Sequence, residues 1–461
     1  MNRNRRKFLR AAAAGGVAYA FGRAPGTVQA QMSGVGGFAD YKALVCLFLF
    51  GGNDSWNMVV PTSTAEYNAY ARSRSGGTPQ SLAVDQAALL PLTLQTPDPR
   101  GWTFGMHPSM TGMQQLFDQG KAAVMANIGP LIQPTTKAQY QAQSVTLPPQ
   151  LFSHNDQQDQ WHSLRGRTVS KTGWGGRVAD VLASQTASQQ LALNVSLAGQ
   201  TFFQAGDVAA PYVMGTTGPV QFPYFGTTGV NLARRQTFEA IANANYGTVY
   251  ERGFATVQKR AVQFADRVSG AVAAGRNFTA LPNAGVTLSS LATQLRTVAK
   301  LIEQRNTLTM SRQIFFVSTG GFDTHDDLVA DQPGLLGNIS SSVKAFYDAL
   351  TEIGMENSVT LFTQSDFGRT LTSNGDGSDH AWGGVQLAVG GAVRGRNFYG
   401  NYPLLEINSA QDVGGGRMIP SISSDQYAAT LARWFGIANA DLAKVAPSIG
   451  NFTQQDIGFM I

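Results

Sequence analysis

Three uninterrupted apolar runs constrain the fold of this chain more than any other feature. Residues 42–50 read KALVCLFLF, residues 312–319 read RQIFFVST and residues 358–363 read SVTLFT. A strand that is apolar on both faces is typical of the centre of a parallel sheet covered on both sides, whereas a half-exposed strand alternates apolar and polar residues. We therefore expect a buried, mostly parallel sheet that contains these three strands.

Helical patterns separate these strands along the chain. Apolar residues recur at helical spacing in the segments 110–117, 174–184, 232–270, 288–301, 343–353 and 424–434, and short strands are expected at 122–128 and 386–389. Strands that alternate with helices predict an α/β fold with a mostly parallel central sheet and helices on both faces. We expect a single domain over residues 31–461 with a helical insertion at about 230–305.

The first 30 residues predict an export signal. Residues 4–10 (NRRKFLR) contain the adjacent pair Arg5 and Arg6, an apolar stretch follows, and residues 28–30 (VQA) are a small-residue cleavage site. The apolar stretch is about half of the ~20 residues that a membrane-spanning helix needs. The segment resembles a twin-arginine (Tat) signal; a basic amphipathic first helix is the alternative. We expect the Tat export machinery as a partner, cleavage near Ala30, a periplasmic or extracellular location and no stable membrane insertion.

Charge and cysteine content exclude two classes of function. The formal net charge is +5, and six basic residues lie in the signal: Arg3, Arg5, Arg6, Lys7, Arg10 and Arg23. Without them the rest of the chain carries −1, so we expect no basic surface for nucleic acid. The one cysteine, Cys46, excludes an intramolecular disulfide and a thiolate zinc cluster. Any metal must therefore be bound by carboxylates and histidines.

Polar motifs follow each of the three predicted strands. They are GGND at 51–54, GGFDTH at 320–325 and QSDFGR at 364–369, with Asp379 and His380 shortly after the third. Ligands of such sheets bind beyond the carboxyl ends of the strands. We therefore expect one metal site from these residues: Asp54, Asp323, His325, Asp366 and His380. Oxygen and imidazole ligands suit Zn²⁺, Mn²⁺, Mg²⁺ or Ca²⁺, although each motif alone is also explained by a turn.

A fourth polar segment, residues 151–157 (LFSHNDQ), follows two prolines. The prolines keep Ser153 out of a helix that the next residues can begin, which places its hydroxyl at a helix N-terminus, where anions bind. Ser153 is interpreted equally well as a nucleophile or as a helix cap, and His154 as orienting Ser153 or binding metal. The Gly-x-Ser-x-Gly spacing of α/β-hydrolases is absent around Ser153. His107 and His162 are interpreted as packing or capping histidines.

Together these motifs resemble a known family. The twin-arginine leader, the motifs at 51–54, 151–157 and 320–325, SDFGRT at 365–370 and DHAWG at 379–383 are similar to those of the exported bacterial proteins of domain-of-unknown-function family 1501 (DUF1501). The resemblance covers nearly the whole mature chain. It implies an alkaline phosphatase/sulfatase-like fold, since members of that superfamily bind one or two metals at strand ends and hydrolyse phosphate or sulfate esters.

The resemblance implies a role for each matching residue. Asp54 resembles the aspartate after the superfamily's first strand, Asp323 and His325 resemble a later pair that is usually spaced more widely, and His380 resembles the last histidine. Ser153 resembles the nucleophile.

Asp366 resembles the aspartate of an Asp-His or Asp-Asn step, but Phe367 follows it here, so one usual ligand is missing. The departure puts a standard two-zinc site in doubt. A single-metal or rearranged site is the alternative.

These expectations predict an exported metal-dependent hydrolase of phosphate or sulfate esters. A divalent metal would polarise the ester oxygen of a small anionic substrate. Ser153 or a metal-bound water would attack, and Arg369 would clamp the anionic group by a bidentate contact. The alternative is a non-catalytic periplasmic binding or assembly protein that retains the fold.

Overall fold

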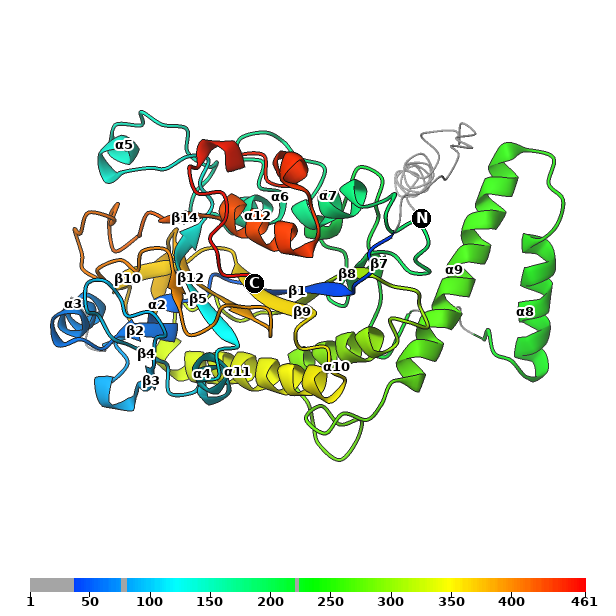
Figure 1. Cartoon of the computed structure of the whole chain (residues 1–461), viewed down its shortest axis with the longest axis horizontal. Coiled ribbons are helices and arrows are strands. Elements are labelled where there is room, and N and C mark those ends of the chain that lie inside the picture. Colours follow the sequence, from blue (N-terminus) through cyan, green and yellow to red (C-terminus); the bar gives the residue numbers. More distant parts are fainter. Residues whose placement is uncertain (1–36, 76–80, 220–223) are drawn as a thin grey trace, which may run out of the picture. The chain divides into compact units, whose positions relative to one another are not determined.

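The computed structural model describes residues 37–75, 81–219 and 224–461. The predicted signal at residues 1–30 lies outside the described residues. The described chain contains a central nine-stranded sheet in the order β13-β5-β12-β9-β1-β8-β6-β7, with β14 also paired to β5 (Figure 1). Its strands are β1 (Lys42–Leu49), β5 (Ala122–Gly129), β6 (Asn194–Ser196), β7 (Tyr212–Val213), β8 (Arg312–Thr319), β9 (Val359–Ser365), β12 (Gly384–Val389), β13 (Phe398–Tyr399) and β14 (Ile422–Ser423).

The three apolar runs form the centre of this sheet. Strand β1 pairs in parallel with both β8 and β9, and Val45 lies opposite Phe315 on one side and Leu361 on the other. Each residue of β1 after its first is at most 1% exposed. The predicted α/β fold with a mostly parallel central sheet is confirmed, and so are the three central strands.

Strand β12 runs antiparallel to both of its neighbours, β5 and β9. A hairpin of β10 (Arg369–Ser373) and β11 (Ser378–His380) connects β9 to β12. Because this hairpin stays at the carboxyl end of β9, β12 begins there and must run in the opposite direction. The connection therefore leaves His380 at the sheet edge where β9 ends.

Alternate residues of β1 face two separate apolar cores. Val45 and Leu47 pack in one core, and Cys46 and Phe48 pack in the other. The first core is covered by α4 (Thr111–Asp118), α10 (Ser290–Glu303) and α11 (Leu328–Glu352). The second is covered by α6 (His154–Ser163), α7 (Trp174–Val181), α12 (Ser424–Phe435) and α13 (Leu442–Val445). Helices therefore cover both faces of the sheet, as the sequence predicts.

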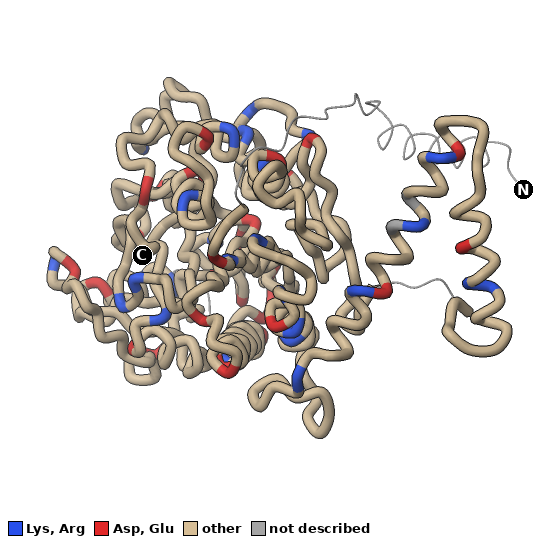
Figure 2. Tube along the Cα trace, turned by 45° about the vertical axis from the view of Figure 1, so that its right-hand side comes forward, with Lys and Arg blue, Asp and Glu red and all other residues tan. Residues whose placement is uncertain are grey.

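The segment where the sequence predicts a helical insertion contains α8 (Gly229–Ala242), α9 (Val249–Ala274) and α10. Helix α8 has no buried residue, whereas α10 buries Leu291, Leu295 and Val298 in the first core. Basic and acidic residues both occur on α8 and α9 (Figure 2), where Arg235 forms ion pairs with Glu239 and Asp266. Only α10 of these three helices is thus a full part of the layer that covers the sheet.

Shorter elements complete the described chain. A small antiparallel sheet is formed by β2 (Val59–Pro61), β4 (Phe104–Met106) and β3 (Leu90–Leu92). The short helices are α2 (Ser55–Met58), α3 (Thr64–Ser75) and α5 (Lys137–Gln141). Among the described helices, none combines the length and apolar character that crossing a membrane requires.

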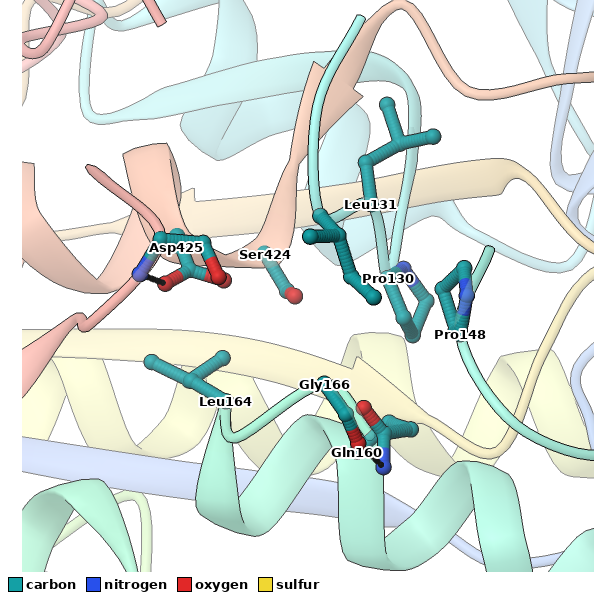
Figure 3. A pocket seen from close by; sticks show the side chains of 10 residues that line it. Pro130, Leu131, Pro148, Gln160, Leu164, Gly166, Ser424 and Asp425 are labelled. Carbon is teal, nitrogen blue, oxygen red and sulfur yellow. Dashed lines mark hydrogen bonds between the residues drawn. The ribbon is translucent and has the colours of Figure 1, made fainter. Parts of the chain in front are cut away.

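One carboxylate is buried against the second core. Asp425, in the first turn of α12, is 3% exposed and lines a narrow pocket with Pro130 and Leu164 (Figure 3). Its Oδ1 accepts a hydrogen bond from the Ser448 N–H at 2.9 Å. Burial raises the pKa of Asp425 to about 7, because the apolar surroundings disfavour the carboxylate more than this hydrogen bond and the charge of Arg177 favour it.

This pKa predicts a pH-dependent stability. The carboxyl titrates near 3.9 in the unfolded chain, so from about pH 4 to about pH 7 the unfolded state has lost the proton that the folded state keeps, and stability falls as pH rises. Asp425→Asn retains the acceptor without this loss. We expect the variant's advantage in free energy of unfolding, measured with urea, to grow by about 1 kcal/mol per pH unit between pH 5.5 and 7 and then to level off. A pH-independent difference would contradict the prediction.

Candidate metal centre

The loops that follow the three central strands pack against one another at their carboxyl ends. Gly51 and Gly52, after β1, both have positive φ angles, of 116° and 81°. A Cβ on Gly51 would lie 2.3 Å from the backbone nitrogen of Asp323, and one on Gly52 would lie 2.3 Å from the Phe367 ring. The two glycines therefore allow an approach between loops that no larger residue permits.

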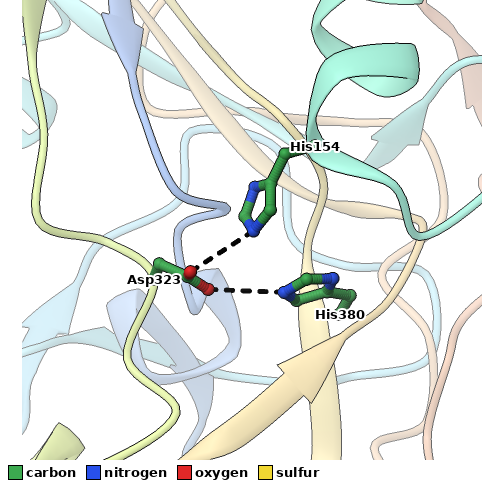
Figure 4. Close-up of side chains that lie close together, drawn as sticks. All are labelled: His154, Asp323 and His380. Carbon is green, nitrogen blue, oxygen red and sulfur yellow. Dashed lines mark ion pairs between the residues drawn. The ribbon is translucent and has the colours of Figure 1, made fainter.

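Three side chains meet at this edge within the span of one ligand shell. Ligand atoms of His154, Asp323 and His380 all lie within 4.8 Å of one another (Figure 4). His154 Nε2 is 3.3 Å from Asp323 Oδ2, and His380 Nε2 is 3.4 Å from Asp323 Oδ1. The three side chains are 28%, 47% and 25% exposed, respectively, so the cluster is open to solvent.

His325 adds a fourth side chain to the same cluster. Its Nε2 is 3.2 Å from Asp323 Oδ1 and 2.8 Å from His380 Nε2. Asp323, His325 and His380, three of the five residues predicted as metal ligands, are therefore brought together. His154, for which metal binding was one of two interpretations, joins them.

His154 is held by a buried carboxylate on its far side. Its Nδ1 lies 2.6 Å from Asp366 Oδ2, an oxygen that also accepts a hydrogen bond from Gln158 Nε2 at 2.9 Å. The other oxygen of Asp366 accepts from the Gly51 N–H at 3.3 Å. Asp366, predicted as a ligand, is fully buried behind His154 and orients that ring, an arrangement common around metal-binding histidines.

The other two histidines of the cluster also have a hydrogen-bond acceptor at Nδ1. His325 Nδ1 is 3.2 Å from Asp379 Oδ1, and His380 Nδ1 is 2.8 Å from the carbonyl oxygen of Phe152. An acceptor at Nδ1 favours the tautomer in which Nδ1 carries the proton and the Nε2 lone pair is free. All three imidazoles therefore direct Nε2 towards Asp323.

This geometry fits a bound cation. Burial lowers the pKa of His380, partly opposed by its hydrogen bond to Phe152, so the neutral ring that can coordinate metal is favoured. The Nε2 atoms of His325 and His380 are 2.8 Å apart, a hydrogen-bond distance at which one ring donates a proton unless a cation takes the place of that proton. Imidazole nitrogens with one carboxylate are a common ligand set for divalent transition metals.

Asp54 does not reach the cluster. Its Oδ1 lies 2.6 Å from Nη2 of Arg74, on α3, and its Oδ2 accepts a hydrogen bond from Ser378 Oγ at 3.0 Å. The Asp54 and Arg74 side chains are both fully buried. The predicted convergence of Asp54 with the other ligands is therefore wrong, because a carboxylate at this depth is paired with a guanidinium instead.

Arg369 is also fully used inside the protein. Its Nη1 donates to Asp323 Oδ1 and to the Gly51 carbonyl, both at 2.9 Å, and its Nε donates to the Ser378 carbonyl at 2.9 Å. Burial alone would raise the pKa of Asp323, but Arg369, with His154 and His325, holds that pKa below its ordinary value. The predicted anion-clamping role does not fit a fully buried side chain; Arg369 positions Asp323.

Ser153 lies at the N-cap position of α6, directly before His154. Its hydroxyl accepts no backbone N–H and instead donates to Asp156 Oδ2 at 2.6 Å. The preceding residue, Phe152, has a left-handed backbone with φ of 77°, and its carbonyl is the one that orients His380. The position expected of a cap is thus observed, but the capping hydrogen bond is not.

The two remaining histidines lie apart from the cluster. His107 Nδ1 accepts the Ser109 N–H at 3.2 Å, and burial lowers the pKa of His107 to about 4. His162 packs against aromatic rings such as that of Phe48, and burial lowers its pKa to about 3. Both are the packing or capping histidines that the sequence predicts.

Three contributors to this region, Asp379, Gln158 and Arg74, were given no role from the sequence. Asp379 directly precedes the predicted ligand His380, and Gln158 follows His154 by one helical turn. Both positions could have been inferred from these neighbouring histidines. Arg74 lies in a short helix with no motif around it. Nothing local to the sequence connects Arg74 with Asp54.

Comparisons with known proteins give one sequence family and remote structural likenesses. The model of a family described as "Protein of unknown function (DUF1501)" matches residues 41–437. No curated protein matches the chain. A crystal structure of Ps i-CgsB is 9% identical with a TM-score of 0.37, covering 89% of this chain and 77% of that chain.

Two other solved structures have similar values. The lipoteichoic acid synthase LtaP from Listeria monocytogenes is 8% identical with a TM-score of 0.34, covering 90% of this chain and 76% of that chain. The soluble domain of lipooligosaccharide phosphoethanolamine transferase A from Neisseria meningitidis is 9% identical with a TM-score of 0.34, covering 89% of this chain and 94% of that chain.

The placement of Arg369 predicts a structural effect. Arg369→Met leaves two buried carbonyls unpaired and removes the counter-charge of Asp323, so we expect a loss of about 3 kcal/mol in free energy of unfolding. Arg417→Met is the control, because Arg417 is only half-buried, and we expect it to cost about 1 kcal/mol or less. Urea unfolding at pH 7 measures both. Equal, small losses would show that Arg369 is not needed for stability.

Proposed function

Since the chain belongs to the DUF1501 family, whose description assigns no activity, we propose its function from its site: an exported, metal-dependent hydrolase of phosphate or sulfate esters. One observation carries the proposal. Three imidazoles, each with an acceptor at Nδ1, direct Nε2 at one carboxylate on the open edge of a parallel sheet. The resemblance to the alkaline phosphatase and sulfatase superfamily supports the same class of reaction.

The residues that would hold the cation are His154, Asp323, His325 and His380. A divalent cation bound there supplies a Lewis acid that polarises an ester oxygen. Asp366 and Asp379 keep His154 and His325 oriented, so the ligand geometry exists before substrate arrives. Pre-organisation of this kind is what metal-assisted hydrolysis requires from a protein.

Arg417 is the arginine best placed to bind the anionic group. Its Nε donates to the His380 carbonyl at 3.0 Å, and its guanidinium lies 5.3 Å from the Phe152 ring centroid. Its Nη1 donates to the Gly414 carbonyl at 3.0 Å, but its Nη2 donates to no described residue. Arg417 therefore keeps donors for a ligand beside Phe152 and Ser153, whereas Arg369 does not.

Ser153 is the proposed nucleophile, with Asp156 as its base. The hydroxyl already donates to Asp156 Oδ2 at 2.6 Å. Attack forms a bond from Ser153 Oγ to phosphorus or sulfur while the bond to the alcohol oxygen breaks, the hydroxyl proton passes to Asp156, and the leaving alcohol takes a proton from water. The hydroxide left from that water then attacks the serine ester, and Asp156 returns its proton to Ser153 Oγ as the bond from Oγ to phosphorus or sulfur breaks. This two-step scheme lowers each barrier.

The purified mature chain tests this proposal on a generic aryl phosphate and aryl sulfate. We expect turnover that a chelator abolishes and added Zn²⁺ or Mn²⁺ restores. His325→Ala should lose bound metal and turnover. Ser153→Ala should keep metal and lose turnover by about three orders of magnitude or more, whereas Ser341→Ala, on exposed α11 surface, should match the wild type.

Other outcomes of that assay have definite meanings. Wild-type turnover in Ser153→Ala would assign the attack to water and leave Ser153 as part of the helix start. Metal bound without turnover of any ester would favour a binding or assembly protein over an enzyme.

Export is proposed from the signal at residues 1–30 alone. The machinery reads the arginine pair as an address, so Arg5→Lys combined with Arg6→Lys should hold the precursor in the cytoplasm. Fractionation and immunoblotting measure the location, with Arg23→Lys as the control. Wild-type amounts of the double variant outside the cytoplasm would contradict a twin-arginine route.

A further inference from the structure

We propose that the centre takes a single divalent cation, and that Arg74 supplies a built-in positive charge at Asp54, the carboxylate that the sequence predicts as a metal ligand. The inference rests on the proposed metal-dependent function and specifies how many ions that function uses. It follows from the ion pair of Asp54, from the separation of Asp54 from the histidines and from the packing of Phe367.

The Arg74–Asp54 pair is sealed inside the protein. Arg74 Nη2 lies 2.6 Å from Asp54 Oδ1 and 2.7 Å from Asn57 Oδ1. Arg74 Nε also donates to Asn57 Oδ1 at 3.0 Å, and its Nη1 donates to the Thr370 carbonyl at 3.0 Å. The guanidinium is therefore fixed on three sides. A second cation at Asp54 would have to displace a charge that is already in place.

Asp54 is connected to the cluster but does not face it. Ser378 Oγ donates to Asp54 Oδ2 at 3.0 Å, and the carbonyl of Ser378 accepts from Arg369 Nε at 2.9 Å. Arg369 then reaches Asp323 Oδ1 at 2.9 Å. One serine and one arginine thus separate the carboxylate of Asp54 from Asp323, and Arg74 lies on the opposite side of that carboxylate.

Two ion pairs account for the carboxylates of Asp54 and Asp323. Asp54 is paired with Arg74, and Asp323 with Arg369. Without Arg74 the buried carboxylate of Asp54 would be left unpaired, which is costly. Arg74 therefore already supplies the positive charge that a second cation at Asp54 would bring.

The space beside the cluster is apolar. The Phe367 ring lies 4.8 Å from the His154 ring and 4.6 Å from the His380 ring, between centroids, and is 2% exposed. A hydrocarbon side chain there offers no ligand atom. Among the described residues, the His154, Asp323 and His380 group is the one cluster of histidine and acidic side chains found close enough to hold a metal ion.

Counting zinc tests the inference without measuring activity. The mature chain is stripped with chelator, dialysed against Zn²⁺ and assayed for zinc per chain by mass spectrometry, and its affinity is measured by calorimetric titration. We expect one Zn²⁺ per chain. Asp54→Asn combined with Arg74→Met replaces a neutral ion pair with neutral side chains of similar size. We expect it to bind one Zn²⁺ with an affinity within about threefold of the wild type.

Two further variants serve as references. Asp323→Asn removes a ligand and should lower zinc affinity by about 100-fold. Asp348→Asn combined with Lys344→Met removes a half-buried ion pair within α11 and should change neither the count nor the affinity. It is the matched control for double substitution.

The outcomes separate this inference from the proposed function. Two Zn²⁺ per wild-type chain would overturn the inference and leave the metal-dependent function standing, and a fall to one in the double variant would identify Asp54 as the second ligand. A folded wild type that binds no Zn²⁺, Mn²⁺ or Mg²⁺ would overturn the metal-dependent function itself. The number of Zn²⁺ ions per wild-type chain tests the single-ion inference even if the double variant fails to fold.

Discussion

The arrangement of the candidate site depends on one buried guanidinium. Arg369 bonds to the loop after β1 through Gly51, to the loop after β8 through Asp323 and to strand β11 through Ser378. Taking a charge out of water is expensive unless carboxylate and carbonyl partners surround it. Because this arginine has such partners from three separate segments, each loop fixes the others, and Asp323 is presented to solvent from a rigid base.

Topology brings the other ligands to the same edge. The β10–β11 hairpin keeps the chain at the carboxyl end of β9, so His380 stays close to the residues that follow β8. Helix α6 covers the second core with Trp161 and places His154 at its exposed start. The site therefore combines two strand ends, one hairpin and one helix start, and packing of the apolar core holds each of them in position.

The sequence predicted the parts of this structure that depend on local pattern. Continuous apolar runs identified β1, β8 and β9, and the polar motifs after β8 and β9 identified Asp323, His325 and Asp366. The sequence did not predict which partners the buried charged side chains take, because those partners depend on how deeply each side chain lies in the fold. Asp54 and Arg369 have the residue types and positions expected of a ligand and an anion-binding residue. Both side chains are nevertheless buried, and a buried charge forms an ion pair with an opposite charge nearby. Strands β6 and β7 were missed because two or three residues show no periodicity.

The α8–α9 hairpin differs from the rest of the chain in what it contributes. Since α8 buries no side chain, the energy that holds the sheet together does not depend on its sequence. Changes in the length or composition of α8 are expected to be tolerated far better than changes beside the histidines. Substitutions on α8 should therefore leave the sheet edge with the histidines unchanged, whereas α9 is tied to the first core through Val268 and Ala271.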